Sequence, residues 1–190
     1  MPSLGRIAIF ASGSGSTFAY LADEGREWFE VVALFCNRPN AGVIEKAAAR
    51  HVPVVLIEQD GAWKKTLEDL DPDLVCLAGY LKPFPEDLVD RFRGKVLNVH
   101  PALLPKFGGK GFYGHYVHEA VIASGEKLSG ASVHLVDEGI DTGMILAQSS
   151  VDVREGMDAE ALAQAVQAVE KPLYLETIRK VLEEQRESTN

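Results

Sequence analysis

Short apolar, β-branched runs alternate with helix-length segments through the first half of the chain. Alternation of this kind builds βαβ units, in which right-handed crossovers join parallel strands and helices cover both faces of the sheet. The fold class that follows is α/β, a doubly wound, mostly parallel twisted sheet. The pattern predicts strands over residues 6–11, 31–35, 54–57, 74–78 and 96–100, and helices over residues 17–23, 41–51, 63–70 and 86–92.

The pattern changes after a helix expected over residues 116–124 and closed by Gly125. Two strand-like runs, 131–136 and 144–153, flank the acidic loop 137–143. Two strands joined by so short a connection pair antiparallel. We therefore expect an antiparallel strand pair at one edge of the sheet, toward the C-terminal half of the chain.

A long helical stretch follows this strand pair. Asp158 is expected to cap the helix, and Pro172 is expected to kink or restart it before residues 173–182. The wholly polar residues 183–190 are expected to fray. Because no linker rich in Gly, Ser or Pro divides the chain, residues 1–190 are expected to form a single domain.

The charge balance excludes partners that are held mainly by electrostatics. With 19 basic and 28 acidic residues the net charge is −9, which disfavours binding to nucleic acid or to an anionic membrane. A phosphate group would have to be held locally by a few donors. No apolar run approaches the roughly 18 residues of a membrane span, and residues 1–6 lack the order of a signal peptide. We therefore expect a cytoplasmic protein.

The two cysteines carry no expected chemistry. Cys36 and Cys76 both lie inside apolar runs, where a free thiol acts as a small buried hydrophobic side chain. We expect both to be buried, and neither to form a disulfide or to act as a nucleophile.

Polar residues follow four of the predicted strands at the point where each strand ends. They form the segments 12–16, 79–82, 98–101 and 137–143. In an open parallel sheet, ligands bind outside the carboxyl ends of the strands. The sequence therefore predicts a ligand site along this rim of the sheet.

The segment 12–16, Ser-Gly-Ser-Gly-Ser, lies between a strand and a helix. Exposed backbone N–H groups at a helix N-terminus bind anions. The segment is not a P-loop, because no Lys-Ser/Thr pair follows, and it is a poor dinucleotide motif, because Phe18 and Asn37 replace the third glycine and the ribose-binding acid. A phosphate monoester is favoured over NAD, and a turn that only packs the helix is the alternative.

The element Asn98-x-His100-Pro101 has no nearby serine or cysteine placed as a nucleophile. An amide and an imidazole two residues apart on one strand face are two donors that can point at one atom. Asp141 offers a partner that can orient and protonate the imidazole. The set suits a reaction in which an oxyanion develops and a substrate supplies the nucleophile. A satisfied histidine at a strand end is the alternative.

Two neighbouring features leave alternatives open. His134 faces the same way as Ser132 and is expected to be a buried, hydrogen-bonded supporting histidine, although His100, His134 and Asp141 together would also make two histidines and one carboxylate for a metal. Their spacing is not diagnostic of a metal site. The glycine-rich segment 107–114 is either a mobile flap or a plain loop.

The chain resembles the phosphoribosylglycinamide formyltransferases, within the wider folate-dependent formyltransferase superfamily, from about residue 6 to residue 182. The motifs that carry the resemblance are residues 11–16, 36–39, 77–81, 98–105, 132–134 and 137–143. The resemblance implies a Rossmann-like fold and transfer of a formyl group from 10-formyltetrahydrofolate to the glycyl amine of phosphoribosylglycinamide (GAR), in purine biosynthesis. It implies small-molecule substrates, no metal, and a monomer or homodimer.

The resemblance also implies site residues. The implied catalytic residues are Asn98, His100 and Asp141, with protonated His100 kept charged by Asp141. The residues implied to bind GAR are Gly13, Ser14, Gly15, Ser16 and Thr17, for the phosphate, and Glu170, for the ribose. The residues implied to bind the folate are Leu81, Lys82, Pro83, Phe84, Asn98, Asp137, Glu138, Gly139, Ile140 and Asp141.

Two departures from the family pattern bear on these expectations. Thr17 stands where the family has asparagine, which leaves a hydroxyl for the phosphate. The segment 58–70 is shortened, so the basic residue for the folate tail is not placed, and Lys82 and Lys64 are the candidates. A formyltetrahydrofolate hydrolase or another folate-dependent N-formyltransferase is the alternative enzyme. A phosphate-ligand sensor is disfavoured because the catalytic trio is complete.

Overall fold

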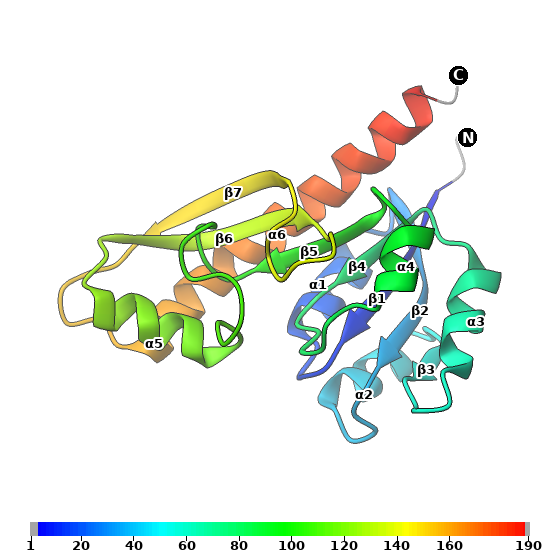
Figure 1. Ribbon diagram of the computed structural model, residues 1–190, viewed down its shortest axis with the longest axis horizontal. Helices are drawn as coiled ribbons and strands as arrows, with labels where there is room; N and C mark the ends of the chain where they lie inside the picture. The colour runs from blue at the N-terminus through cyan, green and yellow to red at the C-terminus, as the bar shows by residue number, and fades with distance from the viewer. Residues whose placement is uncertain (1–3, 189–190) are drawn as a thin grey trace. The chain divides into compact units, whose positions relative to one another are not determined.

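The computed structural model describes residues 4–188 (Figure 1). The strands are β1 (Gly5–Ala11), β2 (Phe29–Cys36), β3 (Val54–Leu56), β4 (Leu74–Leu77), β5 (Val96–His100), β6 (Leu128–Leu135) and β7 (Ile145–Asp152). The helices are α1 (Ser16–Glu24), α2 (Gly42–Ala48), α3 (Ala62–Leu70), α4 (Glu86–Arg91), α5 (His115–Ser124) and α6 (Ala159–Glu187). Every strand and helix expected from the apolar pattern is present, with ends shifted by a few residues.

The strands form one seven-stranded sheet in the order β3-β2-β1-β4-β5-β6-β7. β1 pairs in parallel with β2 and with β4, and β2 pairs in parallel with β3. β7 pairs antiparallel with β6, from Leu128 opposite Asp152 to His134 opposite Ile145. The expected fold class, a mostly parallel α/β sheet with an antiparallel pair in the C-terminal half, is therefore confirmed.

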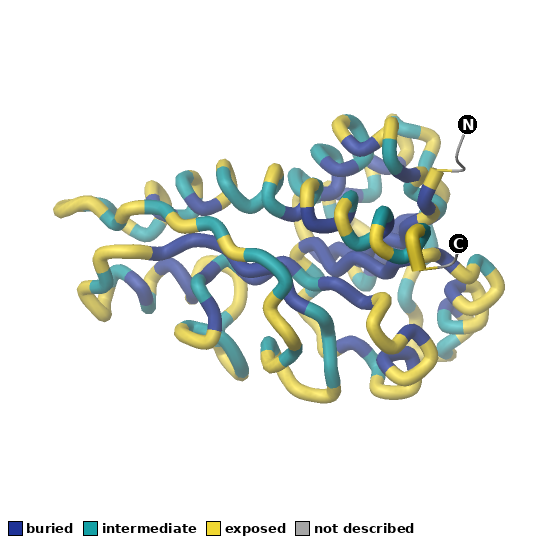
Figure 2. The backbone as a smooth tube through the Cα atoms, turned by 90° about the horizontal axis from the view of Figure 1, so that it is seen from above, coloured by how far each residue is buried: buried dark blue, intermediate teal, exposed yellow. Residues whose placement is uncertain are grey.

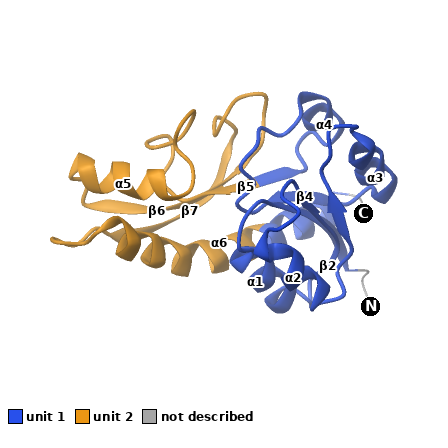
Figure 3. Cartoon of the chain, turned by 90° about the horizontal axis from the view of Figure 1, so that it is seen from below, with its two compact units in different colours: residues 1–97, 178–190 blue, residues 98–177 orange. Residues whose placement is uncertain are grey.

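The chain divides into two compact units (Figure 3). The first contains residues up to Leu97 together with those from Ile178 on, and the second contains Asn98–Thr177. β5 and α6 each contribute residues to both units. The expectation of a single domain stays a prediction.

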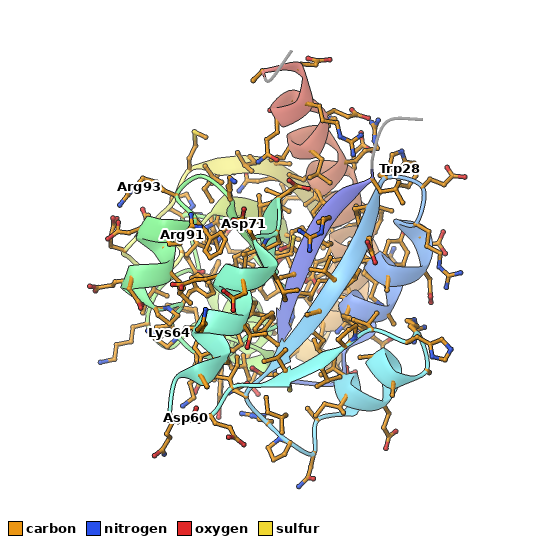
Figure 4. The ribbon with its side chains drawn as sticks, turned by 90° about the vertical axis from the view of Figure 1, so that its right-hand side faces the viewer. Trp28, Asp60, Lys64, Asp71, Arg91 and Arg93 are labelled. Atoms are coloured by element: carbon orange, nitrogen blue, oxygen red, sulfur yellow. The ribbon has the colours of Figure 1, made fainter. Side chains whose placement is uncertain are left out.

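The first unit is a three-layered α/β structure. Helices α1 and α2 cover one face of its strands and α3 and α4 cover the other (Figures 3 and 4). Its buried residues, dark blue in Figure 2, concentrate on the strands. Phe10 of β1 is fully buried and stacks on Phe35 of β2, with ring centroids 4.6 Å apart. Trp63, Tyr80 and Phe84 present ring edges to Phe10, so one aromatic cluster fills the core beneath α3 and α4.

The second unit holds β6, β7, α5 and most of α6. Figures 1 and 3 show α5 and α6 on opposite faces of the β6–β7 pair. Leu162, Val166 and Tyr174 of α6 and Val117 and Val121 of α5 are all fully buried. These side chains supply the apolar core on which the polar site of this unit is built.

Helix α6 differs from the expected pattern in two ways. It runs without a break through Pro172, because the proline is exposed and the rest of the helix is held by its buried face. It also continues to Glu187, so residues 183–187 are helical rather than frayed. Asp158 caps the helix as expected, since its Oδ1 accepts the Ala161 N–H at 2.8 Å.

Several smaller expectations can be compared with the described residues. Cys36 and Cys76 are both buried, free thiols, as predicted. Within residues 4–188, no helix is both long and apolar enough to cross a membrane. Residues 1–3, part of the segment in which no signal peptide was expected, lie outside the described residues. Residues 189–190, the end of the expected polar tail, lie outside them as well.

The aromatic cluster generates a stability prediction. Phe10→Ala should lower the free energy of unfolding by about 3–5 kcal/mol, because it removes a buried ring and leaves a cavity among four others. Urea unfolding followed by circular dichroism measures this value. Leu128→Ala, at a side chain that is 51% exposed, is the control and should change the value by less than about 0.5 kcal/mol. A loss below about 1 kcal/mol for Phe10→Ala would show that the cluster contributes little.

Candidate active site

The glycine–serine loop lies in the first unit, between the end of β1 and the start of α1. Gly15 is the N-cap of α1 and has a left-handed backbone conformation, with φ of 76°. A Cβ at Gly15 would lie 2.5 Å from Cβ of Val43, so only glycine fits here. The N-cap position makes no side-chain cap hydrogen bond, and Gly13 and Ser14 are exposed. The loop therefore presents main-chain donors, as the sequence predicted for an anion site.

Ser12 connects this loop to the segment that follows β4. Its side chain is buried and donates a hydrogen bond to Oδ1 of Asn37 at 2.6 Å. The same Oγ accepts the Leu81 N–H at 3.0 Å, and the Ser12 N–H donates to the Gly79 carbonyl at 3.1 Å. The Ser12 hydroxyl therefore connects the loop expected to bind GAR with Leu81, the first residue expected to bind the folate. Asn37 was expected only to lack the carboxylate of a dinucleotide site, and its role as the acceptor for Ser12 was not predicted.

The other expected folate residues of the first unit differ in exposure. Lys82 and Pro83 are exposed, whereas the Phe84 side chain is buried against Phe10, with ring centroids 5.3 Å apart. Phe84 therefore offers its main chain rather than its ring to a ligand.

The two candidates for the folate tail differ in their ion pairs. The Lys64 ammonium lies 2.7 Å from Oδ2 of Asp87, on the face of α3 seen in Figure 4. Lys82 has no carboxylate partner among the described residues. Because Lys64 is already paired with Asp87, Lys82 is the better candidate to bind the acidic folate tail.

The catalytic trio expected from the sequence lies entirely in the second unit. His100, at the end of β5, is 4% exposed. Its Nε2 lies 2.7 Å from the Phe107 carbonyl, and its Nδ1 lies 3.5 Å from Oδ2 of Asp141. Because a carbonyl only accepts, Nε2 carries a proton and donates it to Phe107. The imidazole is thus held between a main-chain acceptor and a carboxylate.

Asp141 lies between two imidazoles. Its Oδ2 accepts the Gly109 N–H at 3.0 Å, and its Oδ1 lies 3.5 Å from Nε2 of His134. Burial raises the pKa of Asp141, but the two histidines and the Gly109 N–H lower it by more, so the net pKa is below the usual value. Asp141 is therefore ionised at neutral pH. Its backbone is left-handed, with φ of 57°, which aims the carboxylate inward.

Asn98 is positioned by His134, which is 2% exposed. His134 Nδ1 donates to the Leu135 carbonyl at 2.8 Å, and its Nε2 lies 3.1 Å from Nδ2 of Asn98. The amide nitrogen only donates, so Nε2 accepts one of its two N–H groups and the second is left for a substrate. The expectation that His134 is a buried, hydrogen-bonded supporting histidine is confirmed.

Burial and the neighbouring carboxylate act on the pKa of His100 in opposite directions. Burial lowers the pKa of His100 below its ordinary value of 6.5, and His134 lowers it further. Asp141 and the Phe107 carbonyl raise the pKa by less. The net pKa of His100 lies below 6.5, which favours the neutral imidazole at pH 7. Desolvation thus lowers the pKa of His100 by more than the Asp141 carboxylate raises it, and the expectation that Asp141 keeps His100 charged during the reaction stays a prediction.

A cavity of about 350 Å³ opens beside Asp141. Its lining residues are Leu104, Pro105, Gly108, Gly109, Ile140, Asp141, Thr142, Gly143 and Ile145. The loop 137–143 has its own hydrogen bonds, since Oδ1 of Asp137 accepts from Gly139 N–H at 3.0 Å and Thr142 Oγ1 at 2.6 Å. Three expected folate residues of this loop, Glu138, Gly139 and Ile140, are exposed. The cavity is large enough for part of a small-molecule substrate.

Three further residues of the second unit have surroundings that the sequence did not predict. Phe107 and Gly109 act through main-chain groups, which the glycine-rich composition of the segment 107–114 does not reveal. His118 of α5 is 5% exposed, and its Nδ1 has no hydrogen-bond partner among the described residues. Glu170 lies half-buried on α6. Within residues 4–188, no group of three His, Cys, Asp or Glu side chains is arranged to hold a metal ion.

A family model described as formyl transferase matches residues 5–178 of the chain. The chain belongs to the formyl transferase family. Among formyl transferases it is 41% identical to the chloroplastic phosphoribosylglycinamide formyltransferase of Arabidopsis thaliana, an alignment that covers 96% of this chain and 67% of that relative. It is 34% identical to phosphoribosylglycinamide formyltransferase of Bacillus subtilis, covering 93% of this chain and 94% of the relative.

A solved formyl transferase structure supports the same assignment. The glycinamide ribonucleotide transformylase 1 of Geobacillus kaustophilus superimposes with a TM-score of 0.86 at 34% identity, covering 95% of this chain and 100% of that one. The resemblance to phosphoribosylglycinamide formyltransferases that the sequence motifs indicated is therefore confirmed.

The two imidazoles beside one carboxylate generate a titration prediction. Asp141→Asn should lower the pKa of His100 further, because it removes the main influence that raises it. NMR titration of the imidazole C–H signals measures the midpoint. Asp137→Asn is the matched control, since it neutralises a carboxylate of the same loop that contacts Gly139 and Thr142 instead. An unchanged or higher midpoint in Asp141→Asn would show that its charge does not act on His100.

Proposed function

We propose that this protein transfers the formyl group of 10-formyltetrahydrofolate to the glycyl amine of GAR, giving formyl-GAR and tetrahydrofolate. The observation that carries the proposal is the pairing of an amide donor on Asn98 with a carboxylate-backed imidazole on His100, in a chain of the formyl transferase family. Such a pair suits acyl transfer between two bound substrates, in which a tetrahedral oxyanion forms and one proton is relocated.

A neutral His100 fits the first step of this reaction. The glycyl amine has a pKa near 8, so an appreciable fraction is unprotonated at pH 7. As its nitrogen attacks the formyl carbon, the amine becomes acidic and His100 accepts its proton on Nε2, in the tautomer that carries the imidazole's own proton on Nδ1, toward Oδ2 of Asp141. The imidazolium and the second N–H of Asn98 then stabilise the oxyanion, with Asp141 stabilising the imidazolium. The proton passes to N10 of the folate as the carbon–N10 bond breaks, which gives formyl-GAR and a neutral tetrahydrofolate nitrogen and returns His100 to its neutral form.

This sequence of steps requires the contact between His100 and Phe107 to open. Nε2 of His100 donates to the Phe107 carbonyl at 2.7 Å, and this hydrogen bond occupies the nitrogen that the substrate has to reach. Phe107 has a φ of 55°, an uncommon conformation for a non-glycine residue. Rotation of this peptide away from His100 would free Nε2 of the imidazole. It would also let Phe107 leave its uncommon backbone conformation. The segment 107–114 acts as a flap in this proposal.

We assign the substrate contacts as follows. The phosphate of GAR is held by Gly13, Ser14, Gly15, Ser16 and the Thr17 hydroxyl, and its ribose by Glu170. The folate is held by the main chain of residues 81–84 and 137–141. Lys82 meets the acidic folate tail, because the other candidate, Lys64, is paired with Asp87. A monomeric or homodimeric state and a cytoplasmic location remain predictions.

The proposal predicts that folate turnover depends on GAR. Release of tetrahydrofolate from 10-formyltetrahydrofolate, followed spectroscopically, should be rapid with GAR and close to background without it. Dependence is expected because the nucleophile is the substrate amine and not water. Equal release in the presence and absence of GAR would instead indicate a formyltetrahydrofolate hydrolase. No release under either condition would exclude both enzymes.

The second prediction concerns the oxyanion donor. Asn98→Asp replaces an N–H donor by a negative charge where the formyl oxygen becomes negative, so kcat should fall by about 10²–10³ or more. The KM for GAR should change little, because the phosphate binds elsewhere in the proposal. Steady-state kinetics and a melting curve test both points.

Gln164→Glu makes the same amide-to-acid change on the exposed face of α6 and is the matched control. It should leave kcat unchanged. If folded Asn98→Asp loses less than about tenfold in kcat, Asn98 is not the oxyanion donor.

A further inference from the structure

The glycine–serine loop is held from behind by helix α2 of the same unit. Two carbonyls of the loop accept hydrogen bonds from α2: Gly13 from the Val43 N–H at 3.1 Å and Ser14 from the Lys46 ammonium at 2.5 Å. Gly15 packs so closely on Val43 that no Cβ fits between them. The loop and α2 are therefore in direct contact along three consecutive loop residues.

These two hydrogen bonds determine where the N–H groups of the loop point. In a trans peptide unit the carbonyl and the following N–H point in opposite directions. Because the Gly13 and Ser14 carbonyls face α2, the N–H groups of Ser14 and Gly15 face away from it. The donor side of the loop is thus turned toward the side where Gly13 and Ser14 are exposed.

The Lys46 ammonium has different surroundings from those of Lys64, Lys65 and Lys106. The ammonium groups of Lys64, Lys65 and Lys106 each lie within 2.9 Å of a carboxylate. Lys46 instead contacts a neutral carbonyl, and no carboxylate of the described residues pairs with it. In a protein with a net charge of −9, this is an uncompensated positive charge held at an anion-binding loop.

Helix α2 is itself anchored at its other end. Arg50, just beyond α2, forms a two-pronged ion pair with Asp23 of α1, with Nε–Oδ1 at 2.9 Å and Nη2–Oδ2 at 2.7 Å. Its Nη1 also donates to the Lys46 carbonyl at 3.0 Å. The two helices are therefore joined at both ends, and the Lys46 side chain extends from a backbone that is held in place.

We propose that Lys46 is a positioning residue for the phosphate of the ribonucleotide substrate: its ammonium holds the Ser14 carbonyl back, turns the Gly15 N–H outward, and places a positive charge behind the loop. The inference rests on the proposed function, since it concerns the phosphate of that substrate. It adds a charged residue from a second helix to a loop that otherwise offers N–H and hydroxyl donors.

Phosphate-ester binding to the full-length protein tests this inference without requiring turnover. Lys46→Met keeps the length of the side chain but removes the charge and the donor. It should weaken binding of ribose 5-phosphate, measured by calorimetry, by about 10- to 100-fold, the effect of losing one charge-assisted hydrogen bond. The loss should shrink as salt concentration rises, because the contribution of charge is screened. Lys46→Arg should restore most of the affinity.

A comparison of substrates distinguishes positioning for phosphate from a general structural role. Lys46→Met should raise the KM for GAR, but it should leave the KM for the folate and the binding of dephosphorylated glycinamide riboside unchanged. Lys65→Met, at an exposed lysine paired with Asp69 on α3, is the matched control and should have no effect. Both variants should retain the melting temperature of the wild type within a few degrees.

The possible failures are separable. Unchanged ribose 5-phosphate binding in folded Lys46→Met, or equal losses for the phosphorylated and dephosphorylated ligands, would overturn the role of Lys46 and leave GAR-dependent formyl transfer intact. Wild-type protein that binds no ribose 5-phosphate would overturn both the role of Lys46 and the assignment of the loop to the phosphate. Wild-type protein that binds ribose 5-phosphate normally but shows no GAR-dependent turnover would overturn the proposed function and GAR as the source of the phosphate, whereas the effect of Lys46→Met on phosphate binding would still test the position of Lys46.

Discussion

The second unit is organised around the burial of one negative charge. The Asp141 side chain is only 10% exposed, and an ionised carboxylate removed from water costs several kcal/mol unless donors or positive charge compensate it. The Gly109 N–H donates to it at 3.0 Å, and the imidazoles of His100 and His134 each lie 3.5 Å from one of its oxygens, where a protonated ring would compensate the charge. Each partner comes from a different segment, so satisfying this carboxylate requires the loops and both strands to converge. The same requirement brings the Asn98 amide close, through His134.

Much of the architecture follows from local patterns in the sequence. Alternating apolar runs and helix-length segments predicted the strands, because a strand buried on both faces must be apolar along its length. The rule that ligands bind at strand ends placed Asn98, His100 and Asp141 in one site before any geometry was known. The pairing of Ser132 and His134 on one strand face also predicted the supporting histidine, since strand side chains alternate with a period of two.

What the sequence did not predict depends on main-chain groups and on burial. Every residue carries a carbonyl and nearly every residue carries an N–H. The residue types therefore do not indicate that the Phe107 carbonyl contacts His100 or that the Gly109 N–H contacts Asp141. The neutral state of His100 is likewise a consequence of tertiary desolvation. Pro172 shows the converse: its local tendency to break a helix is overridden where packing holds the turns on either side.

Helix α6 has a consequence for synthesis on the ribosome. The residues from Ile178 on belong to the first unit, where Leu182 covers Gly5 at the start of β1 and Arg186 donates to the Trp28 carbonyl. The sheet of that unit is complete in sequence at Leu97, yet its last packing partners end at Glu187, 90 residues later. At about 5–20 residues per second, the emerging chain waits roughly 5–18 s with that part of its core open. Until Leu182 is synthesised, the start of β1 at Gly5 therefore lacks the side chain that covers it in the folded protein.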